Sequence, residues 1–219
     1  MRVDELSEER KRRPGSPPDH YFAAKPGARS NESEFVLELR GVSLRLLTDH
    51  GVFSKGKLDR GTQLLAKEMW VPPKGRLLDL GCGYGPLGLL AAKLEPEIQV
   101  VMVDVNERAV DLASRNAERN GVRNAVAIAG DVREAVSGEF DAIVCNPPIK
   151  AGKAAIMALI EYAAAHLTPD GLLWLVMQTH HGAKTLQRDI APWFAKVECA
   201  AIQGGYRVLV ATARDERPT

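Results

Sequence analysis

Along residues 74–194, short apolar runs alternate with longer amphipathic stretches. The apolar runs cover residues 76–80, 99–104, 125–129, 141–145 and 172–178, each of a length typical of a buried strand. The stretches 87–94, 108–120, 153–166 and 183–194 have their apolar residues at helical spacing. Continuously apolar strands that alternate with helices indicate a parallel sheet covered by helices on both faces.

The last part of the chain breaks this alternation. The runs 196–202 and 206–213 flank Gly204 and Gly205, with no helix between them. Two strand-like runs around a pair of glycines predict an antiparallel hairpin. The pattern therefore predicts an α/β fold with a mostly parallel sheet of six or seven strands, of which the last is reversed.

The first third of the chain follows another pattern. The runs 35–39 and 42–47 alternate around Arg40-Gly41, which predicts a β-hairpin. A loop-like stretch leads from residue 51 to residue 62, and we expect a short helix at 63–70 that ends before Pro72-Pro73. Dense charge followed by Pro, Gly and Ser predicts a flexible tail. The expected organisation is a tail (1–19), an N-terminal extension that packs on the main domain (20–73), and an α/β domain (74–219).

The composition is that of a globular protein without a strong overall charge. The 219 residues are 45% hydrophobic and 26% charged, and the formal net charge is +1. A surface that binds nucleic acid must therefore be a local patch. The longest apolar stretch, 171–177, is too short to cross a membrane, and the charged N-terminus lacks the apolar core of a secretion signal. We expect a cytoplasmic protein without a membrane partner; the sequence does not specify an oligomeric state.

Metal binding is not predicted. The three cysteines, Cys82, Cys145 and Cys199, are far apart and form no Cys-x-x-Cys pair. His180 and His181 are adjacent but lack a third ligand at a plausible spacing. Reduced thiols and a site without metal are the expectation.

Residues 79–85 (Asp-Leu-Gly-Cys-Gly-Tyr-Gly) form a glycine-rich turn between a predicted strand and a predicted helix. Glycines let the backbone approach a ligand closely, and the start of the helix offers free N–H groups. Dinucleotide-binding proteins use a similar turn, but a pyrophosphate at this place would be repelled by the carboxylate of Asp79. The ammonium group of S-adenosylmethionine would instead be attracted by it.

Acidic residues follow the next two predicted strands. Asp104 ends the second strand, where a carboxylate can accept both ribose hydroxyls of a nucleoside. Asp131 follows the third strand and is placed to accept from an adenine amino group. The alternative for Asp104 and for Asn106 is capping of the next helix, and a capped turn is the alternative for Asp131.

Residues 146–149 (Asn-Pro-Pro-Ile) follow the buried strand 141–145 directly. Two prolines hold the backbone extended and remove two N–H donors. The side-chain oxygen of Asn146 and the carbonyl of Pro147 then remain as acceptors in a restricted geometry. Two such acceptors can orient a planar NH2 group for methyl transfer by proximity and alignment. Strand termination by the prolines, and a core position for Ile149, are the structural alternatives.

The loop 53–62 and the residues after the Asn-Pro-Pro segment supply basic and aromatic side chains. An aromatic ring with neighbouring cations can stack on a base and contact phosphate. The candidate RNA-contacting residues are Phe53, Lys55, Lys57, Lys150 and Lys153. Packing of the loop, and a solvated position for Lys153 at a helix start, are the alternatives.

These segments together give the chain a resemblance to a known family. From about residue 20 to residue 212 it resembles the small-domain S-adenosylmethionine-dependent methyltransferases of the ribosomal RNA guanine-N2 type, in the stand-alone form with one domain. The segments that carry the resemblance are 51–62, 79–85, 104–110 and 146–153. The resemblance implies a Rossmann-like class I fold with a seven-stranded sheet, S-adenosylmethionine as cofactor, and ribosomal RNA or a ribosomal particle as partner.

The resemblance also implies roles for individual residues. The catalytic segment would be Asn146, Pro147, Pro148 and Ile149. Within it Asn146 and Pro147 would hold the target amine, and Ile149, where duplicated relatives have an aromatic residue, would pack on the flat ring. The cofactor would be held by Asp59, Thr62, Asp79, Gly81, Cys82, Gly83, Asp104, Val105, Asn106, Asp131, Val132 and Asn146.

Several functions stay open at the level of sequence. An Asn-Pro-Pro segment also serves methylation of adenine N6 and of a protein glutamine amide. A nicotinamide-dependent oxidoreductase would explain the glycine turn and Asp104, but not Asp79 or Asn146. An RNA-binding assembly factor without turnover is a third class, which the two acceptors at Asn146 and Pro147 disfavour.

Overall fold

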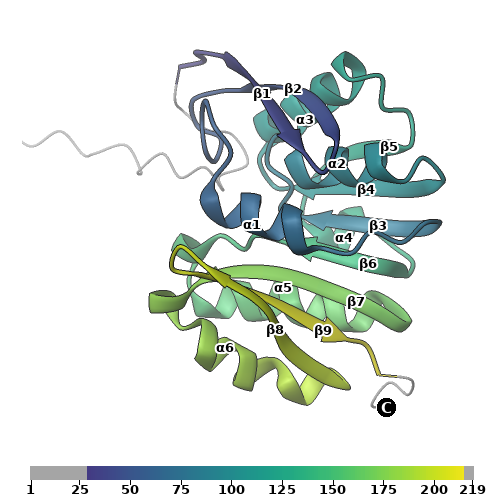
Figure 1. The fold of residues 1–219 in the computed structure, drawn as a ribbon, viewed down its shortest axis with the longest axis vertical. Coiled ribbons are helices and arrows are strands. Elements are labelled where there is room, and N and C mark those ends of the chain that lie inside the picture. Colours follow the sequence, from purple (N-terminus) through teal and green to yellow (C-terminus); the bar gives the residue numbers. More distant parts are fainter. Residues whose placement is uncertain (1–28, 215–219) are drawn as a thin grey trace, which may run out of the picture.

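A seven-stranded sheet forms the centre of the computed structural model, which describes residues 29–214 (Figure 1). The predicted tail and the first residues of the extension lie outside this range. The strand order is β5-β4-β3-β6-β7-β9-β8. The strands are β3 (Gly75–Leu80), β4 (Ile98–Asp104), β5 (Ala125–Ala129), β6 (Phe140–Cys145), β7 (Leu167–Gln178), β8 (Lys196–Gln203) and β9 (Tyr206–Thr212).

The pairing within the sheet confirms the predicted fold class. Strands β3 to β7 pair in parallel, whereas β9 is antiparallel to both β7 and β8, between which it lies. The reversed last strand follows from the hairpin turn at Gly204 and Gly205, both of which have positive φ.

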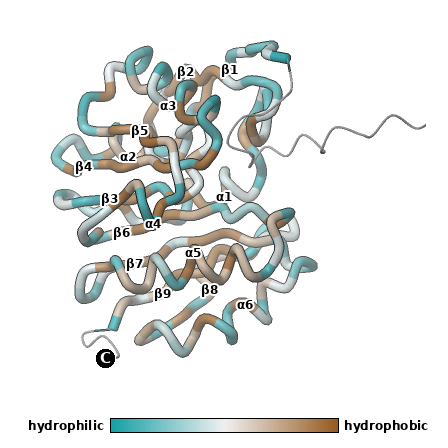
Figure 2. The backbone as a smooth tube through the Cα atoms, turned by 180° about the vertical axis from the view of Figure 1, so that it is seen from behind, coloured by the Kyte–Doolittle hydropathy of each residue, from teal (hydrophilic) through white to brown (hydrophobic). Residues whose placement is uncertain are grey.

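Helices cover both faces of the sheet, as predicted from the continuously apolar strands. Successive strand residues such as Leu77 and Leu78 belong to different core clusters because their side chains alternate between the faces. Figure 2 shows apolar residues concentrated along the strands and polar ones in the outer loops. One face carries α1 (Arg60–Glu68), α2 (Pro86–Leu94) and α3 (Glu107–Arg119), and the other carries α4 (Val132–Ala135), α5 (Lys153–His166) and α6 (Ala183–Ile190).

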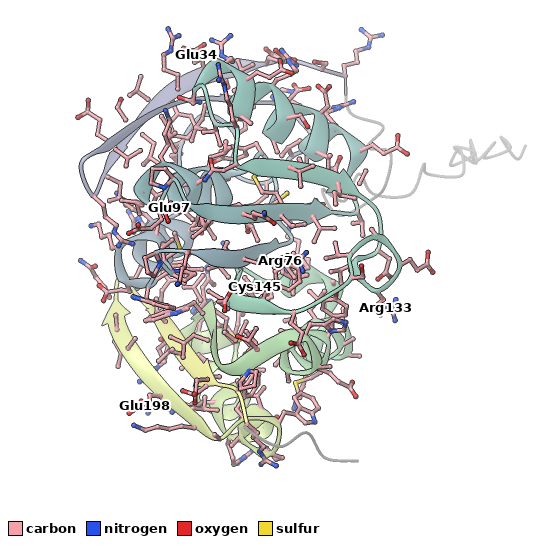
Figure 3. The ribbon with its side chains drawn as sticks, turned by 90° about the vertical axis from the view of Figure 1, so that its right-hand side faces the viewer. Glu34, Arg76, Glu97, Arg133, Cys145 and Glu198 are labelled. Carbon is pink, nitrogen blue, oxygen red and sulfur yellow. The ribbon has the colours of Figure 1, made fainter. Side chains whose placement is uncertain are left out.

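Side chains separate by polarity between the sheet and the surface. In Figure 3, Cys145 lies within the sheet, and only 2% of it is exposed. The labelled Arg133 and Glu198 lie at the periphery, with 65% and 53% of their side chains exposed. Burial raises the pKa of the Cys145 thiol, so this cysteine is a core residue and not a reactive one.

Element boundaries differ from the predicted ones where a local contact decides them. Helix α1 begins at Arg60, three residues before the predicted start, because the Asp59 side chain accepts from the backbone N–H of Thr62. It ends at Glu68, so Pro72-Pro73 is not what terminates it.

The other differences concern helices on the opposite face of the sheet. Pro192 lies in a short 3-10 turn after α6, which therefore ends at Ile190 and not at residue 194. The four-residue helix α4 was not predicted because it is too short to show a periodicity.

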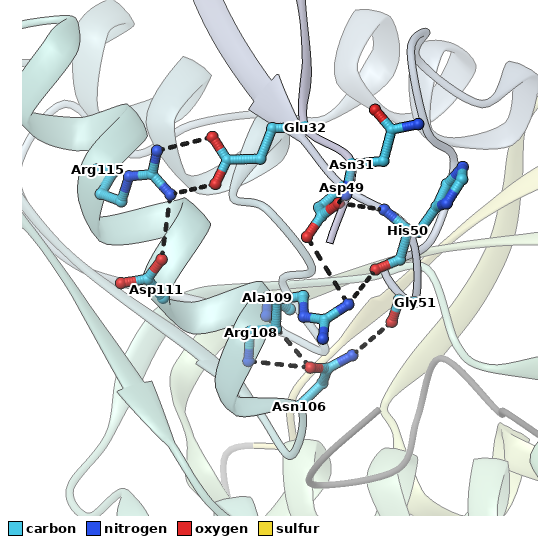
Figure 4. A network of polar contacts seen from close by, with 10 residues as sticks. All are labelled: Asn31, Glu32, Asp49, His50, Gly51, Asn106, Arg108, Ala109, Asp111 and Arg115. Atoms are coloured by element: carbon cyan, nitrogen blue, oxygen red, sulfur yellow. Dashed lines mark hydrogen bonds and ion pairs between the residues drawn. The ribbon is translucent and has the colours of Figure 1, made fainter. Parts of the chain in front are cut away.

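The predicted N-terminal hairpin is confirmed as β1 (Ser33–Leu39) and β2 (Val42–Thr48). It forms a separate two-stranded sheet that packs on α2 and α3. Figure 4 shows how polar groups join it to α3: the Arg115 guanidinium holds both carboxylate oxygens of Glu32, at 2.6 and 2.8 Å. The Arg108 guanidinium donates to the His50 carbonyl at 2.6 Å and lies 3.7 Å from the Asp49 carboxylate.

Two asparagines form hydrogen bonds with the backbone of β2 as a neighbouring strand would: Asn116 in α3 and Asn120 directly after this helix. The Asn116 side chain accepts from Leu47 N–H at 2.7 Å and donates to the Leu47 carbonyl at 3.0 Å. One turn later, Asn120 does the same for Arg45, at 2.8 Å in both directions. Asn116 also donates to the Tyr84 carbonyl at 3.0 Å, which joins the hairpin to the glycine-rich turn. Asn116 is fully buried, so these backbone groups depend on it for their hydrogen bonds.

We predict that Asn116→Ala lowers the free energy of unfolding by about 2–3 kcal/mol, because the N–H and C=O of Leu47 lose their partner in a place that water does not reach. Urea denaturation followed by circular dichroism measures this. Asn120→Ala is the matched control: it removes the same pair of hydrogen bonds at an exposed position, where water replaces them, and should cost less than about 1 kcal/mol. Equal losses in the two variants would contradict the role of burial.

Candidate active site

A cavity of about 680 Å³ opens at the carboxyl ends of β3, β4 and β6. Its walls are the loops that follow these strands, together with a loop of the N-terminal extension. Open parallel sheets bind ligands at this edge, and the volume is within the usual range for a small-molecule site. Most of the predicted site residues line it, namely Phe53, Asp59, Thr62, Asp79, Gly81, Cys82, Gly83, Asp104, Val105, Asp131, Val132, Asn146, Pro147, Pro148, Ile149 and Lys150.

The glycine-rich turn brings backbone close to this cavity. Gly81, Gly83 and Gly85 have positive φ, which residues with a side chain rarely adopt. Gly81 N–H and Cys82 N–H both donate to the Val103 carbonyl, at 2.9 and 3.0 Å, so the turn is tied to β4. The turn therefore has one fixed path between β3 and α2.

Asp79 is a carboxyl group buried beneath the turn, with 1% of it exposed. Its Oδ2 accepts from the Gly88 N–H in the first turn of α2 at 2.8 Å. Burial raises the pKa of Asp79 to about 7, and the nearby Asp104 adds to the rise, while the hydrogen bond from Gly88 opposes it. A cation in the cavity would favour the ionised form of this group.

Asp104 is held in one orientation by backbone donors. Its Oδ2 accepts from Gly83 N–H and its Oδ1 from Asn106 N–H, both at 2.9 Å. Burial raises the pKa of Asp104 despite these hydrogen bonds. The carboxylate lines the cavity with both oxygens fixed, so it can accept further hydrogen bonds from a ligand.

Asn106 does not line the cavity, and its role in cofactor binding stays a prediction. It is fully buried and caps α3: its Oδ1 accepts from the N–H groups of Arg108 and Ala109, at 3.0 and 3.3 Å. Its Nδ2 donates to the Gly51 carbonyl at 2.8 Å, which anchors the extension loop (Figure 4). The structure places its side chain in the alternative role, that of a helix cap.

Asp131 is a helix cap that also lies at the cavity. It caps α4 by accepting from Arg133 N–H at 3.0 Å, and it also lines the cavity. The Arg133 guanidinium pairs with its carboxylate and lowers the pKa of Asp131 to about 2. The group is therefore ionised at neutral pH, with part of its surface open to a ligand.

Asn146 is held by two residues at the start of α1. Its Nδ2 donates to Thr62 Oγ1 at 2.8 Å and to Asp59 Oδ2 at 3.3 Å. A carboxylate only accepts hydrogen bonds, so the amide nitrogen is the end that faces Asp59. The side-chain oxygen consequently points away from α1, in a residue that lines the cavity.

The predicted RNA-contacting residues divide into three groups. Phe53, with 37% of it exposed, and the exposed Lys150 line the cavity. Lys55 and Lys57 lie in the same extension loop but do not line it. Lys153 was predicted to contact RNA, but it lies outside the lining and forms an ion pair with Asp189 of α6. This pair corresponds to the alternative of a surface residue at a helix start.

Sequence reasoning missed several residues of the cavity, above all Tyr206 and Gln178. Tyr206 begins β9, and its hydroxyl lies 3.4 Å from Asp59 Oδ1 while it accepts from Gln178 Nε2 at 2.8 Å. Tyr206 and Gln178 are opposite each other in the β7–β9 register. The contact of Tyr206 with Asp59 spans 147 positions of the chain, so no local spacing points to it. Tyr84, His181 and Leu159 also line the cavity.

The described residues, 29–214, contain no group of three or more His, Cys, Asp or Glu side chains that could hold a metal ion. Among the helices of this part of the chain, none has the length and apolarity needed to cross a membrane.

The fold, together with the cavity at the carboxyl ends of β3, β4 and β6, is that of an S-adenosylmethionine-dependent methyltransferase of Rossmann-like fold. More narrowly, the chain belongs to the methyltransferase small domain family, whose model matches residues 43–210.

Similar proteins support this assignment over most of the chain. The uncharacterised protein YbxB of Bacillus subtilis is 38% identical over 88% of this chain and 98% of its own length. Ribosomal RNA small subunit methyltransferase C of Pseudomonas entomophila is 34% identical over 89% of this chain. Among solved structures, the T. thermophilus 16S rRNA N2 G1207 methyltransferase, in complex with AdoMet and guanosine, matches with a TM-score of 0.75 and 31% identity over 86% of this chain.

The lengths of these relatives differ from one another. The chain spans 58% of the Pseudomonas enzyme and 52% of the T. thermophilus structure, but nearly all of the Bacillus protein. It thus corresponds to about half of the relatives with a named ribosomal RNA activity.

The chemistry of the cavity fits S-adenosylmethionine as the cofactor. That molecule carries an ammonium group, two ribose hydroxyls and an adenine amino group, all of which donate hydrogen bonds. The cavity offers three carboxyl groups as acceptors, those of Asp79, Asp104 and Asp131, at the ends of successive strands. The buried carboxyl of Asp79, which is costly to ionise alone, is suited to a cationic ligand.

We predict that Asp79→Asn makes the ligand-free protein more stable at pH 8, by about 2–4 kcal/mol. The folded pKa of Asp79 is raised from 3.8 to about 7, so the protonated carboxyl stabilises the fold fully below pH 4, and this contribution is lost as the pH rises to 7. Asn keeps an acceptor for Gly88 N–H but does not ionise. Urea unfolding at pH 4 and pH 8 measures the difference, which should vanish at the lower pH; a variant that is less stable at both would contradict the raised pKa.

Proposed function

We propose that this chain transfers a methyl group from S-adenosylmethionine to an exocyclic amine of a nucleobase, most specifically to guanine N2 of ribosomal RNA, in the cytoplasm. The observation that carries the proposal is the position of Asn146. It follows β6, next to the glycine-rich turn after β3, and its amide nitrogen is already occupied by Thr62 and Asp59. Its oxygen is thereby directed toward the cavity as an acceptor for an amino group.

The cofactor side of the proposal uses the three carboxyl groups. Asp79 would hold the ammonium group, Asp104 the ribose hydroxyls and Asp131 the adenine amino group. The backbone at Gly81 and Gly83 has no side chain to obstruct the approach of the ligand. When bound, S-adenosylmethionine supplies an electrophilic methyl group on a sulfonium centre.

The substrate side uses the Asn-Pro-Pro segment. The Asn146 side-chain oxygen and the Pro147 carbonyl would accept the two hydrogens of the planar amine, which turns the nitrogen lone pair toward the methyl donor. The amine nitrogen becomes acidic only as the new bond forms, so its proton leaves late and no strong base is required. The contribution of these residues is alignment of the reacting groups.

Guanine is favoured among the possible amines by the relatives of this chain. The T. thermophilus enzyme with guanosine in its structure is 31% identical to this chain, and the ribosomal RNA methyltransferase C relatives fall in the same range. Ile149 stands after the two prolines, where the duplicated relatives have an aromatic residue, so the target ring would pack on an aliphatic side chain in this chain. Adenine N6 and the glutamine amide are the alternatives that an assay on several substrates distinguishes.

Basic residues near the cavity suit a phosphate-bearing substrate. Lys150 lines the cavity, and Lys55 and Lys57 lie in the loop that carries Phe53. None of these three lysines forms an ion pair within residues 29–214, whereas Lys153, Arg115 and Arg119 do. Lysines without an acidic neighbour remain available to phosphate groups.

We predict that Asn146→Ala lowers methyl transfer at least tenfold while the affinity for S-adenosylhomocysteine changes by less than about twofold, because the lost acceptor contacts the amine and not the cofactor. Transfer of a labelled methyl group to small ribosomal subunits from cells that lack the protein measures the first quantity, and calorimetric titration the second. Full turnover in this variant would remove Asn146 from the mechanism.

The same assay on RNA, DNA and release-factor protein tests the substrate class. Label in guanine N2 of ribosomal RNA is the expected outcome, and label only in adenine or in a glutamine amide would overturn the guanine assignment. Tight binding of NAD with no response to S-adenosylhomocysteine would overturn the reaction class.

We predict that replacing Lys55 and Lys57 together by Glu raises the KM for RNA about three- to tenfold and makes binding less dependent on salt, with little change in kcat. Steady-state assays at two salt concentrations measure this. Lys93→Glu is the control, because Lys93 is exposed in the last turn of α2, at the opposite edge of the sheet from the cavity. An equal effect of the control would mean that overall charge, and not this loop, attracts the RNA.

A further inference from the structure

We infer that Asp59, Thr62 and Tyr206 are positioning residues: they form a hydrogen-bonded network that fixes which end of the Asn146 amide faces the substrate. The inference rests on the proposed function and deepens it, because it assigns a cause to the acceptor character of Asn146. The resemblance stated at the level of sequence implied that Asp59 and Thr62 bind the cofactor. Their contacts in the structure point to Asn146 instead.

The network is directional because its centre can only accept. The carboxylate of Asp59 receives hydrogens from the Thr62 N–H at 3.0 Å, from the Thr62 hydroxyl at 3.3 Å and from Asn146 Nδ2 at 3.3 Å. The Thr62 hydroxyl donates its single hydrogen to Asp59. Its oxygen can therefore only accept in its contact with Asn146 Nδ2, at 2.8 Å. Rotating the amide by 180° would place its oxygen against a carboxylate and a hydroxyl oxygen with no hydrogen to give, which is unfavourable.

Tyr206 supports Asp59 from the start of β9. Gln178 donates to the Tyr206 hydroxyl oxygen at 2.8 Å, which leaves the hydroxyl hydrogen for Asp59 Oδ1 at 3.4 Å. Tyr206 and Gln178 are paired across β9 and β7, so this arm is part of the sheet and not of a mobile loop. The carboxylate is thereby held between α1 and the sheet, with each of its oxygens bonded.

Gly61 is the residue that lets Tyr206 come this close to α1. A Cβ at position 61 would lie 2.8 Å from two ring carbons of Tyr206 and 3.0 Å from Asp59 Oδ2, closer than real side chains approach. Gly61 has no positive φ, so its lack of a side chain serves the close approach and not the backbone conformation. One geometry thus explains three residues of this segment: Asp59 is the acceptor, Gly61 leaves space for the tyrosine ring, and the Thr62 hydroxyl both donates and accepts.

The consequence for function is selectivity for a hydrogen-bond donor. With its nitrogen engaged by Asp59 and Thr62, Asn146 offers oxygen to the substrate, which suits an amino group and disfavours a carbonyl. A site built to hydrogen-bond one such group discriminates strongly, because the wrong partner leaves buried polar atoms unsatisfied. Asn146 contacts the substrate, whereas Asp59, Thr62 and Tyr206 act through it.

The test compares Asp59→Asn, Thr62→Val, Thr62→Ser and Tyr206→Phe. Asn at position 59 still caps α1 but can also donate, so it permits both orientations of the Asn146 amide. We expect Asp59→Asn and Thr62→Val to lower kcat about tenfold, with KM and the affinity for S-adenosylhomocysteine within about twofold of wild type. Thr62→Ser keeps the hydroxyl and should restore most of the turnover lost in Thr62→Val, and Tyr206→Phe should lower kcat about threefold.

A second readout does not depend on activity or on bound cofactor. The two ¹⁵N–¹H signals of the Asn146 side-chain amide, identified by their absence in Asn146→Ala, report its hydrogen bonds in an NMR spectrum. They should move in Asp59→Asn, Thr62→Val and Tyr206→Phe, and stay in place in Thr62→Ser. Gln63→Ala is the matched control, an exposed substitution on the same helix, which should move neither the signals nor kcat.

The possible outcomes separate this inference from the proposed function. Unchanged Asn146 signals and unchanged kcat in Asp59→Asn and Thr62→Val would overturn the network, while loss of turnover in Asn146→Ala would still support the proposed function. Loss of cofactor affinity in proportion to kcat would also overturn it and would assign Asp59 and Thr62 to the cofactor. If Asn146→Ala itself keeps full turnover, the role proposed for Asn146 in holding the amine fails, and the NMR result alone decides whether the network exists.

Discussion

Parallel pairing of β3 with β4 on one side and with β6 on the other is the constraint on which the site depends. The pairing aligns Leu80 with Val103 and with Cys145, so the residues that follow these strands emerge at one edge of the sheet. The glycine-rich turn, Asp104 and Asn146 therefore meet although about 65 positions separate the first from the last. A sheet with β6 reversed would send Asn146 to the opposite edge, and the cavity would lose its substrate side.

The N-terminal extension completes this cavity because it is anchored to α3 at several points. Asn116 and Asn120 bond the backbone of β2, and Asn106 holds the Gly51 carbonyl. These contacts fix the path of the loop that follows β2. They therefore also fix the positions of Asp59 and of the first residues of α1. The division of the chain at residues 73 and 74 remains a prediction, but the hairpin and the main sheet share one hydrophobic core. Residues of the N-terminal extension therefore form part of the cavity lining.

Carboxyl groups at the same edge of the sheet have different properties because their surroundings differ. Asp79 is buried with a single backbone donor, and its pKa is raised to about 7. Asp131 is partly exposed beside Arg133, and its pKa is lowered to about 2. Asp59, in turn, collects hydrogens from α1, β6 and β9. The same chemical group can thus attract a cation, accept from a neutral ligand or orient a neighbouring amide, according to what surrounds it.

The sequence by itself determined the strand and helix order, the terminal hairpin, the class of cofactor and most of the cavity lining, because hydrophobic periodicity and the residues after each strand are local properties of the chain. It did not determine that Asn106 caps a helix, that Lys153 pairs with Asp189, or that Tyr206 and Gln178 belong to the site. Those outcomes depend on which side chains meet across distant segments, and a cap, an ion pair or a ligand contact can use the same residue type. Only the packing of α1 against β9 decided that Asp59 and Thr62 hold the Asn146 amide, since hydrogen-bond direction follows from three-dimensional neighbours and not from spacing along the chain.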